Sequence, residues 1–217
     1  SMQRKNQKLV EESPSTAVDS ALREKLYAAT LRAVQAVGYE GVGTVEYLLT
    51  REGEFYFMEM NTRLQVEHPV TEMVTGYDLV KWQIRVAAGM ELPFSQKDVV
   101  LRGHAIECRI NAEDPAHDFR PACGTVEMLE GFRPSVGRVT LLHVPGGPWV
   151  RFDTALYQGY FIPPYYDSMV GKMIVHASSR EEAIRKMQAA LCELVIEGVE
   201  HTGFFQADLI GEEAFVN

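Results

Sequence analysis

The stretch GTVEYLLTREGEFYFMEMNTRLQVEH (residues 43–68) decides how the first part of this chain folds. Two runs rich in β-branched and aromatic residues flank a short Gly-containing segment, a pattern typical of a β-hairpin. A two-residue turn at residues 52–53 pairs Glu46 with Glu59 and Leu48 with Phe57 across the strands. The hairpin therefore predicts two carboxylates that face each other.

Two facing carboxylates repel, because their Cβ atoms lie roughly 4.5–5.5 Å apart. At about 4 Å the repulsion is about 1 kcal/mol in water and about 4 kcal/mol at an intermediate dielectric. A cation between Glu46 and Glu59 removes this penalty, and Asn61 on the same face adds a third oxygen. Such hard oxygen ligands suit Mg²⁺ or Mn²⁺. The alternative is a register shifted by one residue, with one glutamate on a solvated face.

The segment that leaves the hairpin carries polar groups at alternate positions and then meets Pro69. An extended backbone sends Arg63, Gln65 and Glu67 to one side. A cation, an amide and a carboxylate beside a metal site indicate an anion pocket that contains a base. The alternative is an exposed polar loop.

The composition is that of an ordinary globular protein with one large domain or two small ones. The chain has 217 residues, and no apolar run in it approaches the length that spans a bilayer. The net charge of −9 argues against nucleic acid or an anionic membrane as a partner. Three widely spaced cysteines argue against a disulfide scaffold. Since the start shows no signal-peptide pattern either, we expect a cytoplasmic protein.

Helical periodicity and capping residues predict helices at residues 20–38, 79–88 and 180–198, and a short last helix after Thr202. The predicted N-caps are Asp19 or Ser20, Asp78, Ser179 in a capping box with Glu182, and Thr202.

Alternation and Gly/Pro punctuation predict strands at residues 99–110, 124–129, 138–144, 150–153 and 171–177. In the first of these, Glu107 and Arg109 share the face opposite the apolar one. The basic first ten residues show no stripe, which favours a solvated end. FRPACGTVEML (residues 119–129) is echoed by FRPSVGRVTLL (residues 132–142), a local duplication for which we have no functional account.

The segment EMNTRLQVEHPVTEM (residues 59–73) closely resembles the biotin carboxylase family of the ATP-grasp superfamily. The resemblance extends along nearly the whole chain. Further matching segments are MQRKNQK (2–8), GTVEYL (43–48), GHAIECRINAEDP (103–115), PPYYDSMVGK (163–172) and ELVIEGVEHT (193–202). The R-x-Q-V-E-H segment distinguishes this family from other ATP-grasp ligases, which share only the paired acids and the asparagine.

The resemblance implies an α+β fold in two parts. Residues 1–98 would be the C-terminal part of an ATP-grasp domain. Residues 99–217 would be a biotin carboxylase C-terminal domain, mainly an antiparallel sheet with helices. The change from helical to alternating pattern near residues 96–100 agrees with this boundary.

The resemblance also implies a role for each matching residue. Glu46 and Glu59 would hold the metals that bridge the ATP phosphates, with Asn61 on the second metal. The residues that would line the nucleotide pocket are Gln3, Asn6, Leu48 and Val199.

On the substrate side, Glu67 would be the general base that deprotonates bicarbonate. Arg63, Gln65 and the backbone of Val66 would bind bicarbonate. Lys8 would contact bicarbonate and phosphate, and Arg109 would stabilise the enolate oxygen of biotin.

The implied activity is the ATP- and bicarbonate-dependent carboxylation of biotin on a carrier protein, as in the first half-reaction of acetyl-CoA carboxylase in fatty acid synthesis. The expected partners are ATP, Mg²⁺ or Mn²⁺, bicarbonate, the biotin carrier protein and carboxyltransferase subunits, and the full enzyme is expected to be a homodimer. One alternative is the same module of pyruvate or propionyl-CoA carboxylase. Another is a non-catalytic binding or dimerisation fragment.

Three departures from the family pattern bear on this interpretation. Chains of the family are longer, so we expect the N-terminal domain and the Gly-rich lid to be absent here, and the isolated chain to show no turnover. Asn6 stands where the family usually has His, which affects one nucleotide contact. The second FRP copy resembles an insertion ahead of VPGGPWVR (144–151), a region near the dimer contact in relatives.

Overall fold

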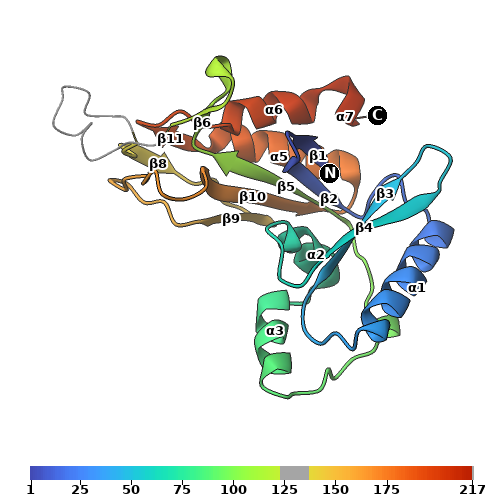
Figure 1. The fold of residues 1–217 in the computed structure, drawn as a ribbon. Coiled ribbons are helices and arrows are strands. Elements are labelled where there is room, and N and C mark those ends of the chain that lie inside the picture. The colour runs from blue at the N-terminus through green and yellow to red at the C-terminus, as the bar shows by residue number, and fades with distance from the viewer. Residues whose placement is uncertain (123–136, 217) are drawn as a thin grey trace. The chain divides into compact units, whose positions relative to one another are not determined.

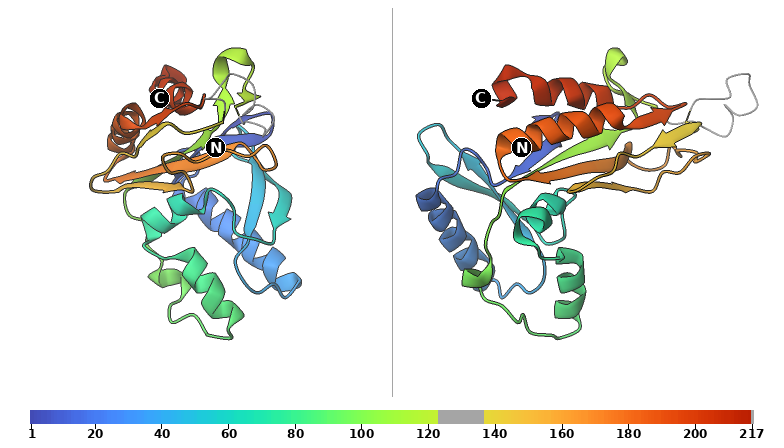
Figure 2. Two further views of the ribbon diagram at one scale, coloured as in Figure 1. Left: turned by 90° about the vertical axis from the view of Figure 1, so that its left-hand side faces the viewer. Right: turned by 180° about the vertical axis from the view of Figure 1, so that it is seen from behind.

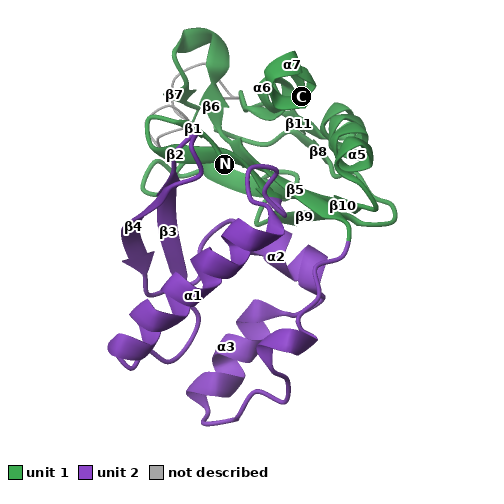
Figure 3. Ribbon diagram, turned by 90° about the vertical axis from the view of Figure 1, so that its right-hand side faces the viewer, with its two compact units in different colours: residues 1–12, 103–217 green, residues 13–102 purple. Residues whose placement is uncertain are grey.

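The computed structural model describes residues 1–122 and 137–216, which form two compact units (Figure 3). The larger unit comprises Ser1–Glu12 and Gly103–Asn217, and the smaller unit is Ser13–Arg102. The chain therefore crosses between the units twice, at residues 12–13 and at residues 102–103. The second crossing lies close to the boundary at residue 98. The domain division predicted from the sequence, into residues 1–98 and 99–217, is based on the domains of the family and not on the compact units. It therefore stays a prediction.

The larger unit is built on a five-stranded sheet in its described residues, with the order β1-β2-β5-β10-β9. The pairs β1–β2, β5–β10 and β9–β10 are antiparallel. These strands are β1 (Met2–Arg4), β2 (Gln7–Ser13), β5 (His104–Asn111), β9 (Val150–Thr154) and β10 (Met169–Ala177). Two short antiparallel pairs join β8 (Leu141–His143) to β11 (Val195–Glu197) and β6 (Glu113–Asp114) to β7 (Arg120–Pro121).

Helices cover one face of this sheet (Figures 1 and 2). They are α5 (Arg180–Glu193), α6 (Gly203–Gly211) and α7 (Glu213–Val216), and η2 (Pro115–His117) is a short 3₁₀ turn. The core between sheet and helices includes Ile106 and Cys108 on β5, Met173 on β10 and Met187 on α5, all 0% exposed. Burial raises the pKa of the Cys108 thiol well above its ordinary value, so this cysteine is an inert packing residue.

The start of the chain is not the solvated end that its composition suggested. Residues 2–13 form the hairpin β1–β2, and Leu9 and Val10 are only 6% and 2% exposed. The turn has φ of 48° at Lys5 and 64° at Asn6, and Asn tolerates this left-handed region better than most residues. The buried side chains of Leu9 and Val10 belong to β2, which is an inner strand of the sheet.

Three other predicted boundaries in the larger unit were wrong. The strand expected from residue 99 begins at His104, and the helix expected to reach residue 198 ends at Glu193. The extended backbone of Leu194 (ψ 120°) ends that helix and starts β11. Within residues 138–144, β8 covers only Leu141–His143. The strand expected at residues 124–129 and most of the FRP duplication lie outside the described residues.

The N-caps predicted in the larger unit, Ser179 in a capping box with Glu182 and Thr202, were only partly confirmed. Ser179 accepts a hydrogen bond from the N–H of Glu182 (3.3 Å), which confirms the start of α5. The Glu182 carboxylate, however, accepts from Ser178 rather than from Ser179. Thr202 precedes α6, but in the described chain its side chain makes no capping hydrogen bond to that helix.

The smaller unit joins the hairpin of β3 (Thr44–Leu49) and β4 (Phe55–Asn61) to three helices (Figure 1). They are α1 (Ser20–Ala36), α2 (His68–Thr75) and α3 (Leu79–Ala87), and η1 (Gln96–Asp98) follows as a 3₁₀ turn. The Asp19 and Asp78 carboxylates each accept a backbone N–H at 2.8 Å, which confirms both predicted N-caps. Neither periodicity nor a capping residue predicted α2. Although α1 and α3 are fully described, neither has a buried residue.

Mixed α and β content with mainly antiparallel sheets confirms the predicted α+β class. In the described part of the chain, every helix falls short of the length and apolar character that crossing a membrane requires.

Candidate active site

The hairpin β3–β4 brings Glu46 opposite Glu59, as predicted, but through a different register. The turn has three residues rather than two, since the N–H of Thr50 donates to the carbonyl of Glu54 (2.8 Å). Leu48 consequently faces Tyr56, not Phe57. A β-bulge next to Glu46 inserts one extra residue in β4 and restores the acid pair.

The bulge gives the hairpin one aromatic face and one acidic face. Phe57 and Glu59 are two residues apart, so a regular strand would put both on one side. Instead, Tyr47 makes edge contacts with Phe55 and Phe57, at centroid distances of 5.4 and 6.4 Å. Glu46 is the residue before Tyr47 and therefore points to the other face, together with its partner Glu59.

On the acidic face, one amide group bridges the two carboxylates. Asn61 Nδ2 donates to Glu46 Oε1 at 3.0 Å and to Glu59 Oε1 at 2.9 Å. The two oxygens thus converge on one point, which the amide nitrogen occupies. Gln65 Nε2 adds a third donor, to Glu46 Oε1 at 2.7 Å. Amide donors offset the like-charge repulsion that the pair would otherwise suffer.

The residues on this face fit a divalent cation. If the amide of Asn61 turns, its oxygen joins the two converging carboxylate oxygens as a hard ligand. No group of three or more His, Cys, Asp or Glu residues in the described ranges could hold a metal by itself. A set of two carboxylates and an amide therefore needs oxygens from outside the protein. That is the usual situation of Mg²⁺, which binds one or two carboxylates together with phosphates and water.

The segment after the hairpin is not extended, so the alternation argument for its side chains was wrong. The chain bends at residues 62–63 and turns at residues 66–67 before α2 begins at His68. Arg63 and Gln65 reach the acidic face by this irregular path. Arg63 Nη2 donates to Asn61 Oδ1 at 3.4 Å, and His68 Nδ1 lies 2.7 Å from the carbonyl oxygen of Gln65.

Among the residues of the acidic face, Gln65 has a buried polar atom that a ligand could satisfy. It is 8% exposed, and its Oε1 atom has no hydrogen-bond partner among the described residues. Leaving a buried carbonyl oxygen without a donor costs about 1–3 kcal/mol. Val66 and Glu67 follow directly, half-buried, at the start of α2.

The remaining predicted residues lie in two parts of the molecule. Leu48 is 58% exposed on β3 of the smaller unit. In the larger unit, Gln3 pairs directly with Lys8 across β1–β2, and Asn6 is in the turn of that hairpin. Arg109 is on β5, and Val199 follows β11. Direct contacts join Glu46, Glu59, Asn61, Arg63 and Gln65. That the residues of both units form one site stays a prediction.

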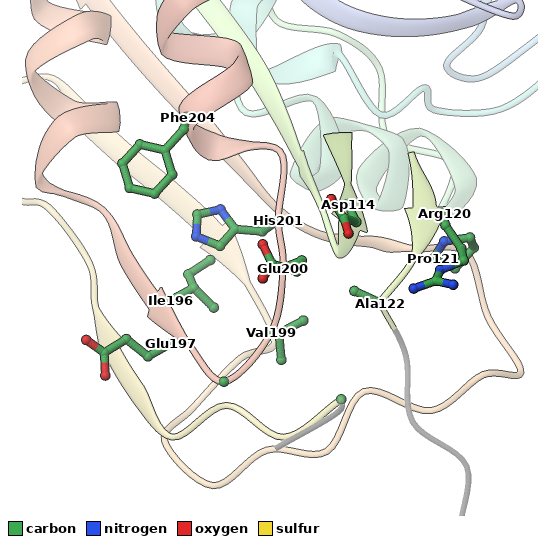
Figure 4. Close-up of a pocket in the computed structure, with 12 residues that line it drawn as sticks. Asp114, Arg120, Pro121, Ala122, Ile196, Glu197, Val199, Glu200, His201 and Phe204 are labelled. Atoms are coloured by element: carbon green, nitrogen blue, oxygen red, sulfur yellow. The ribbon is translucent and has the colours of Figure 1, made fainter. Parts of the chain in front are cut away.

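Val199 lines a cavity of about 510 Å³ in the larger unit (Figure 4). Other residues of its wall are Glu200, His201 and Phe204. Burial lowers the pKa of His201, and the N–H of Gly203 donates to its Nδ1 atom at 3.1 Å. Both observations make this histidine neutral, a structural residue at the start of α6.

The backbone of Arg109 is held from the helical side by buried polar groups. Gln206 Nε2 donates to the carbonyl of Arg109 at 3.0 Å and to that of Leu9 at 3.3 Å. The Thr202 hydroxyl accepts from the N–H of Asn111 at 2.9 Å. Gln206 and Thr202 are 0% exposed, so α6 fixes the strand on which Arg109 stands.

Sequence reasoning missed Lys172, which stands beside Arg109, and Asp153, which stands beside Lys172 on the far side. Lys172 pairs with Arg109 on one side and with Asp153 on the other. Lys172 closes the PPYYDSMVGK segment, but nothing in the local sequence shows that its strand lies between β5 and β9.

Comparison with known families gives two matches that follow each other along the chain. The model of the carbamoyl-phosphate synthase L chain, ATP-binding domain, matches residues 1–95. The model of the biotin carboxylase C-terminal domain matches residues 127–217.

Among curated relatives, a biotin carboxylase of Nostoc sp. is 58% identical over 207 residues, which is 95% of this chain and 43% of that protein. A pyruvate carboxylase subunit from Methanothermobacter thermautotrophicus is 51% identical over 99% of this chain and 41% of its own. This chain thus spans less than half the length of these relatives.

A solved structure shows the same fold. The biotin carboxylase domain dimer of Hydrogenobacter thermophilus 2-oxoglutarate carboxylase was determined with MgADP, ADP and bicarbonate. It superposes with a TM-score of 0.90 at 44% identity, over 99% of this chain and 44% of that one.

Proposed function

Because this chain belongs to the biotin carboxylase family, we propose that it is a segment of an enzyme that carboxylates biotin on a carrier protein, using ATP and bicarbonate. The observation that carries the proposal is the convergence of Glu46 and Glu59 on one point beside the unsatisfied oxygen of Gln65. The carboxylates suit a metal–phosphate complex. The lone acceptor suits a ligand with a hydroxyl, such as bicarbonate.

In this proposal Glu46, Glu59 and Asn61 hold Mg²⁺ or Mn²⁺ at the nucleotide phosphates. The bound cation would neutralise the charge that develops during phosphoryl transfer. Gln65 Oε1 accepts a hydrogen bond from the hydroxyl of bicarbonate, and Arg63 and the N–H of Val66 bind its oxygens.

Glu67 is the proposed general base. Glu67 directly follows Val66, the last of the proposed bicarbonate ligands, at the turn before α2. A base must stand close to the proton that it removes, and this position in the chain is consistent with that role. Bicarbonate that has lost this proton attacks the γ-phosphorus of ATP and displaces ADP. The resulting carboxyphosphate breaks down to phosphate and CO₂ beside the biotin enolate.

The residues of the larger unit complete the proposed site. Lys8 contacts bicarbonate and phosphate, and Arg109 neutralises the enolate oxygen of biotin. The proposed nucleotide-pocket residues are Gln3, Asn6, Leu48 and Val199. The ligand bound to the Hydrogenobacter relative, MgADP with bicarbonate, supports this combination of substrates.

The proposed acceptor system is acetyl-CoA carboxylase, with carrier protein and carboxyltransferase as partners, a dimeric full enzyme and a cytoplasmic location. The relatives named for pyruvate and 2-oxoglutarate carboxylases favour a keto-acid carboxylase equally well in this module. The biotin half-reaction is common to all of them, so it does not depend on which acceptor is correct.

A second candidate function is a binding or dimerisation segment without turnover. It is favoured by the smaller unit, in which α1 and α3 have no buried residue and Leu48, Tyr56 and Phe57 are 55–59% exposed. Apolar surface of this kind calls for a covering partner.

The experiment compares the 217-residue chain, the full-length protein and its Glu67→Gln variant. Biotin carboxylation and bicarbonate-dependent ATP cleavage are measured with free biotin, and nucleotide affinity is measured by calorimetry. We expect turnover only from the full-length protein. Glu67→Gln should lose about 100-fold or more in carboxylation, a typical loss for a general base, while nucleotide affinity changes little.

Two results would contradict these assignments. An inactive full-length protein would favour the binding segment over the enzyme. Equal losses of nucleotide binding and carboxylation in Glu67→Gln would make Glu67 a structural residue. Glu52→Gln, in the exposed turn of the β3–β4 hairpin, is the control for loss of a carboxylate.

A further inference from the structure

Two turns that are far apart in the sequence meet within the larger unit. One is the turn of the β1–β2 hairpin, where Lys5 and Asn6 have φ of 48° and 64°. The other follows η2, where Asp118 and Phe119 have φ of 53° and 58°. Residues other than glycine rarely adopt this left-handed region, and they stay there only where their surroundings hold them. Each turn therefore depends on the contacts that it makes.

Arg4 joins the two turns by three contacts. Its Nη2 atom donates to Asp118 Oδ1 at 2.8 Å and to the backbone carbonyl of Asp118 at 3.2 Å. Its guanidinium carbon lies 3.9 Å from the centre of the Phe119 ring, which is within the range of a cation–π interaction. Lys5 Nζ lies 3.6 Å from Asp118 Oδ2, the other oxygen of that carboxylate. Two basic residues thus bind the tip of the hairpin to the second turn.

The second turn is anchored on the body of the larger unit. The N–H of Phe119 donates to the carbonyl of Asp114 at 2.8 Å. The Phe119 ring packs edge-on against Phe205 of α6, with the ring centroids 4.9 Å apart. Phe119 is also the first residue of the first FRP copy. Its ring is therefore a fixed surface on which Arg4 rests.

The hairpin needs such support because β1 is short and lies at the edge of the sheet. It consists of Met2–Arg4, and in the described sheet it pairs with β2. Gln3 pairs directly with Lys8, so the two side chains point to one face, and Arg4 points to the other. Gln3 and Lys8 are the residues proposed above for the nucleotide and its phosphate. Because Arg4 directly follows Gln3, a displacement of Arg4 also displaces Gln3.

We propose that Asp118 and Phe119 are positioning residues for the nucleotide, since they hold Arg4 and so fix the strand that presents Gln3 beside Lys8. The inference rests on the proposed function, which makes Gln3 and Lys8 contacts of the nucleotide. Exposed ion pairs and cation–π contacts add little to stability. The side chain of Asp118 is 85% exposed and that of Arg4 is 27% exposed. These contacts therefore matter more for the position of the hairpin than for the folding of the larger unit.

The test measures the affinity of the full-length protein for MgADP by calorimetry, with the KM for biotin and the melting temperature as further readouts. The variants are Arg4→Met, Phe119→Leu, Phe119→Tyr, Asp118→Asn and the double variant Arg4→Met/Phe119→Leu. Asp118→Asn removes the charge and keeps the turn, since asparagine tolerates the left-handed region. Arg85→Met is the matched control, because Arg85 lies over the ring of Trp82 at 4.6 Å, on α3 of the smaller unit.

We expect Arg4→Met and Phe119→Leu each to weaken MgADP binding about 10-fold, less than the loss of about 100-fold that a misplacement of about 1 Å can cause in a reaction. Phe119→Tyr should keep the affinity of the wild type, because it keeps the aromatic face. The double variant should lose no more than the weaker-binding single variant, because both changes remove the same contact. Asp118→Asn should weaken binding by less, since Phe119 still holds Arg4.

The other two readouts separate positioning from a merely structural role. The KM for biotin should stay within about twofold of the wild type in every variant, because a loss confined to nucleotide binding leaves it unchanged. The melting temperature should stay within about 3 °C, as expected for the loss of an exposed ion pair. Arg85→Met should leave all three quantities unchanged.

The proposal is overturned if Arg4→Met and Phe119→Leu bind MgADP as well as Arg85→Met does, or if their losses add in the double variant. Equal losses of MgADP affinity and melting temperature also overturn it. Should Arg4→Met lose its cooperative melting transition, Asp118→Asn decides, since weaker MgADP binding at an unchanged melting temperature supports the proposal and unchanged affinity overturns it. If the wild type binds MgADP without carboxylating biotin, the proposed function fails, and the affinities still decide this inference. A wild type that does not bind MgADP overturns both.

Discussion

At the scale of single residues, Glu59 shows how binding and folding make opposite demands on this hairpin. Its carboxylate faces that of Glu46, and the Asn61 amide bridges the two. A protein selected only for stability would not keep this pair, because a neutral residue at either position removes the repulsion. We therefore expect the pair to cost stability and to be maintained for its ligand.

The corresponding prediction is that Glu59→Gln stabilises the metal-free hairpin and abolishes metal binding. Relief of repulsion should raise the free energy of unfolding by up to about 1 kcal/mol. Mg²⁺ should stabilise the wild type and leave the variant unchanged, as linkage requires of a ligand that binds the folded state. Urea unfolding of the chain with and without Mg²⁺ measures both effects.

Glu52→Gln, an exposed change in the turn of the same hairpin, serves as the control and should alter neither quantity. Retained Mg²⁺-dependent stabilisation in Glu59→Gln would remove Glu59 from the metal site.

At the scale of elements, the hairpin shows what local sequence can and cannot predict. Two β runs around a Gly-containing turn were enough to predict the strands and the Glu46–Glu59 pair. The predicted register of the strands was wrong, because the turn has three residues instead of two. A β-bulge in β4 compensates for the resulting one-residue shift and restores the Glu46–Glu59 pair. Alternation alone cannot reveal a bulge, because the bulge depends on which side chains pack on each face.

Elements that pair with distant segments were the least predictable. β2 and β10 both lie next to β5, although each of these two strands is far from β5 in the sequence. Lys172 was missed for this reason, since only strand order brings it next to Arg109. Caps formed by neighbours, such as Asp19 and Asp78, were predicted correctly because their partners are three residues away.

The contact between α6 and β5 carries a prediction of its own. Gln206→Leu removes the donor to the carbonyls of Arg109 and Leu9, and leaves to the Arg109 carbonyl only the longer hydrogen bond from the Thr202 hydroxyl (3.4 Å) among the side-chain contacts described. Unsatisfied buried acceptors cost about 1–3 kcal/mol, so the free energy of unfolding should fall by that amount. Denaturant unfolding at unchanged m-value measures the loss.

Asp208→Ala is an exposed change on the same helix and should stay within about 0.5 kcal/mol of the wild type. Equal stability of the two variants would show that Gln206 does not secure the strand of Arg109.

At the scale of the whole molecule, an ionic cluster sits beside both chain crossings. Glu12 is the last residue before the first crossing, and His104 is the second residue after the other. Glu12 Oε2 accepts from His104 Nε2 and from Arg180 Nε, each at 2.8 Å. Arg180 also donates to the carbonyls of Phe215 and Val216. One carboxylate thus ties β2, β5, α5 and α7 together within the larger unit.

This cluster makes the stability of the larger unit depend on pH in a defined direction. Burial by itself would raise the pKa of Glu12, but the hydrogen bonds from His104 and Arg180 lower it below the ordinary value of 4.5. The folded state therefore binds fewer protons than the unfolded state in the range just below pH 4.5. The contribution of Glu12 is complete above that value and is lost as the pH falls through the lowered folded-state pKa.

We expect Glu12→Gln to lower the free energy of unfolding at pH 7 by about 1.5–3 kcal/mol, the value of hydrogen bonds to charged groups. The difference between wild type and variant should shrink as the pH drops below 4.5, because the wild type then loses the same charge. Urea unfolding from pH 7 to pH 3 measures it, with Glu11→Gln as the neighbouring control. Glu11 lies 3.5 Å from the N-terminal amino group and has no part in the cluster described here. A difference that stays constant across this range would show that the charge of Glu12 contributes nothing to the stability of the larger unit.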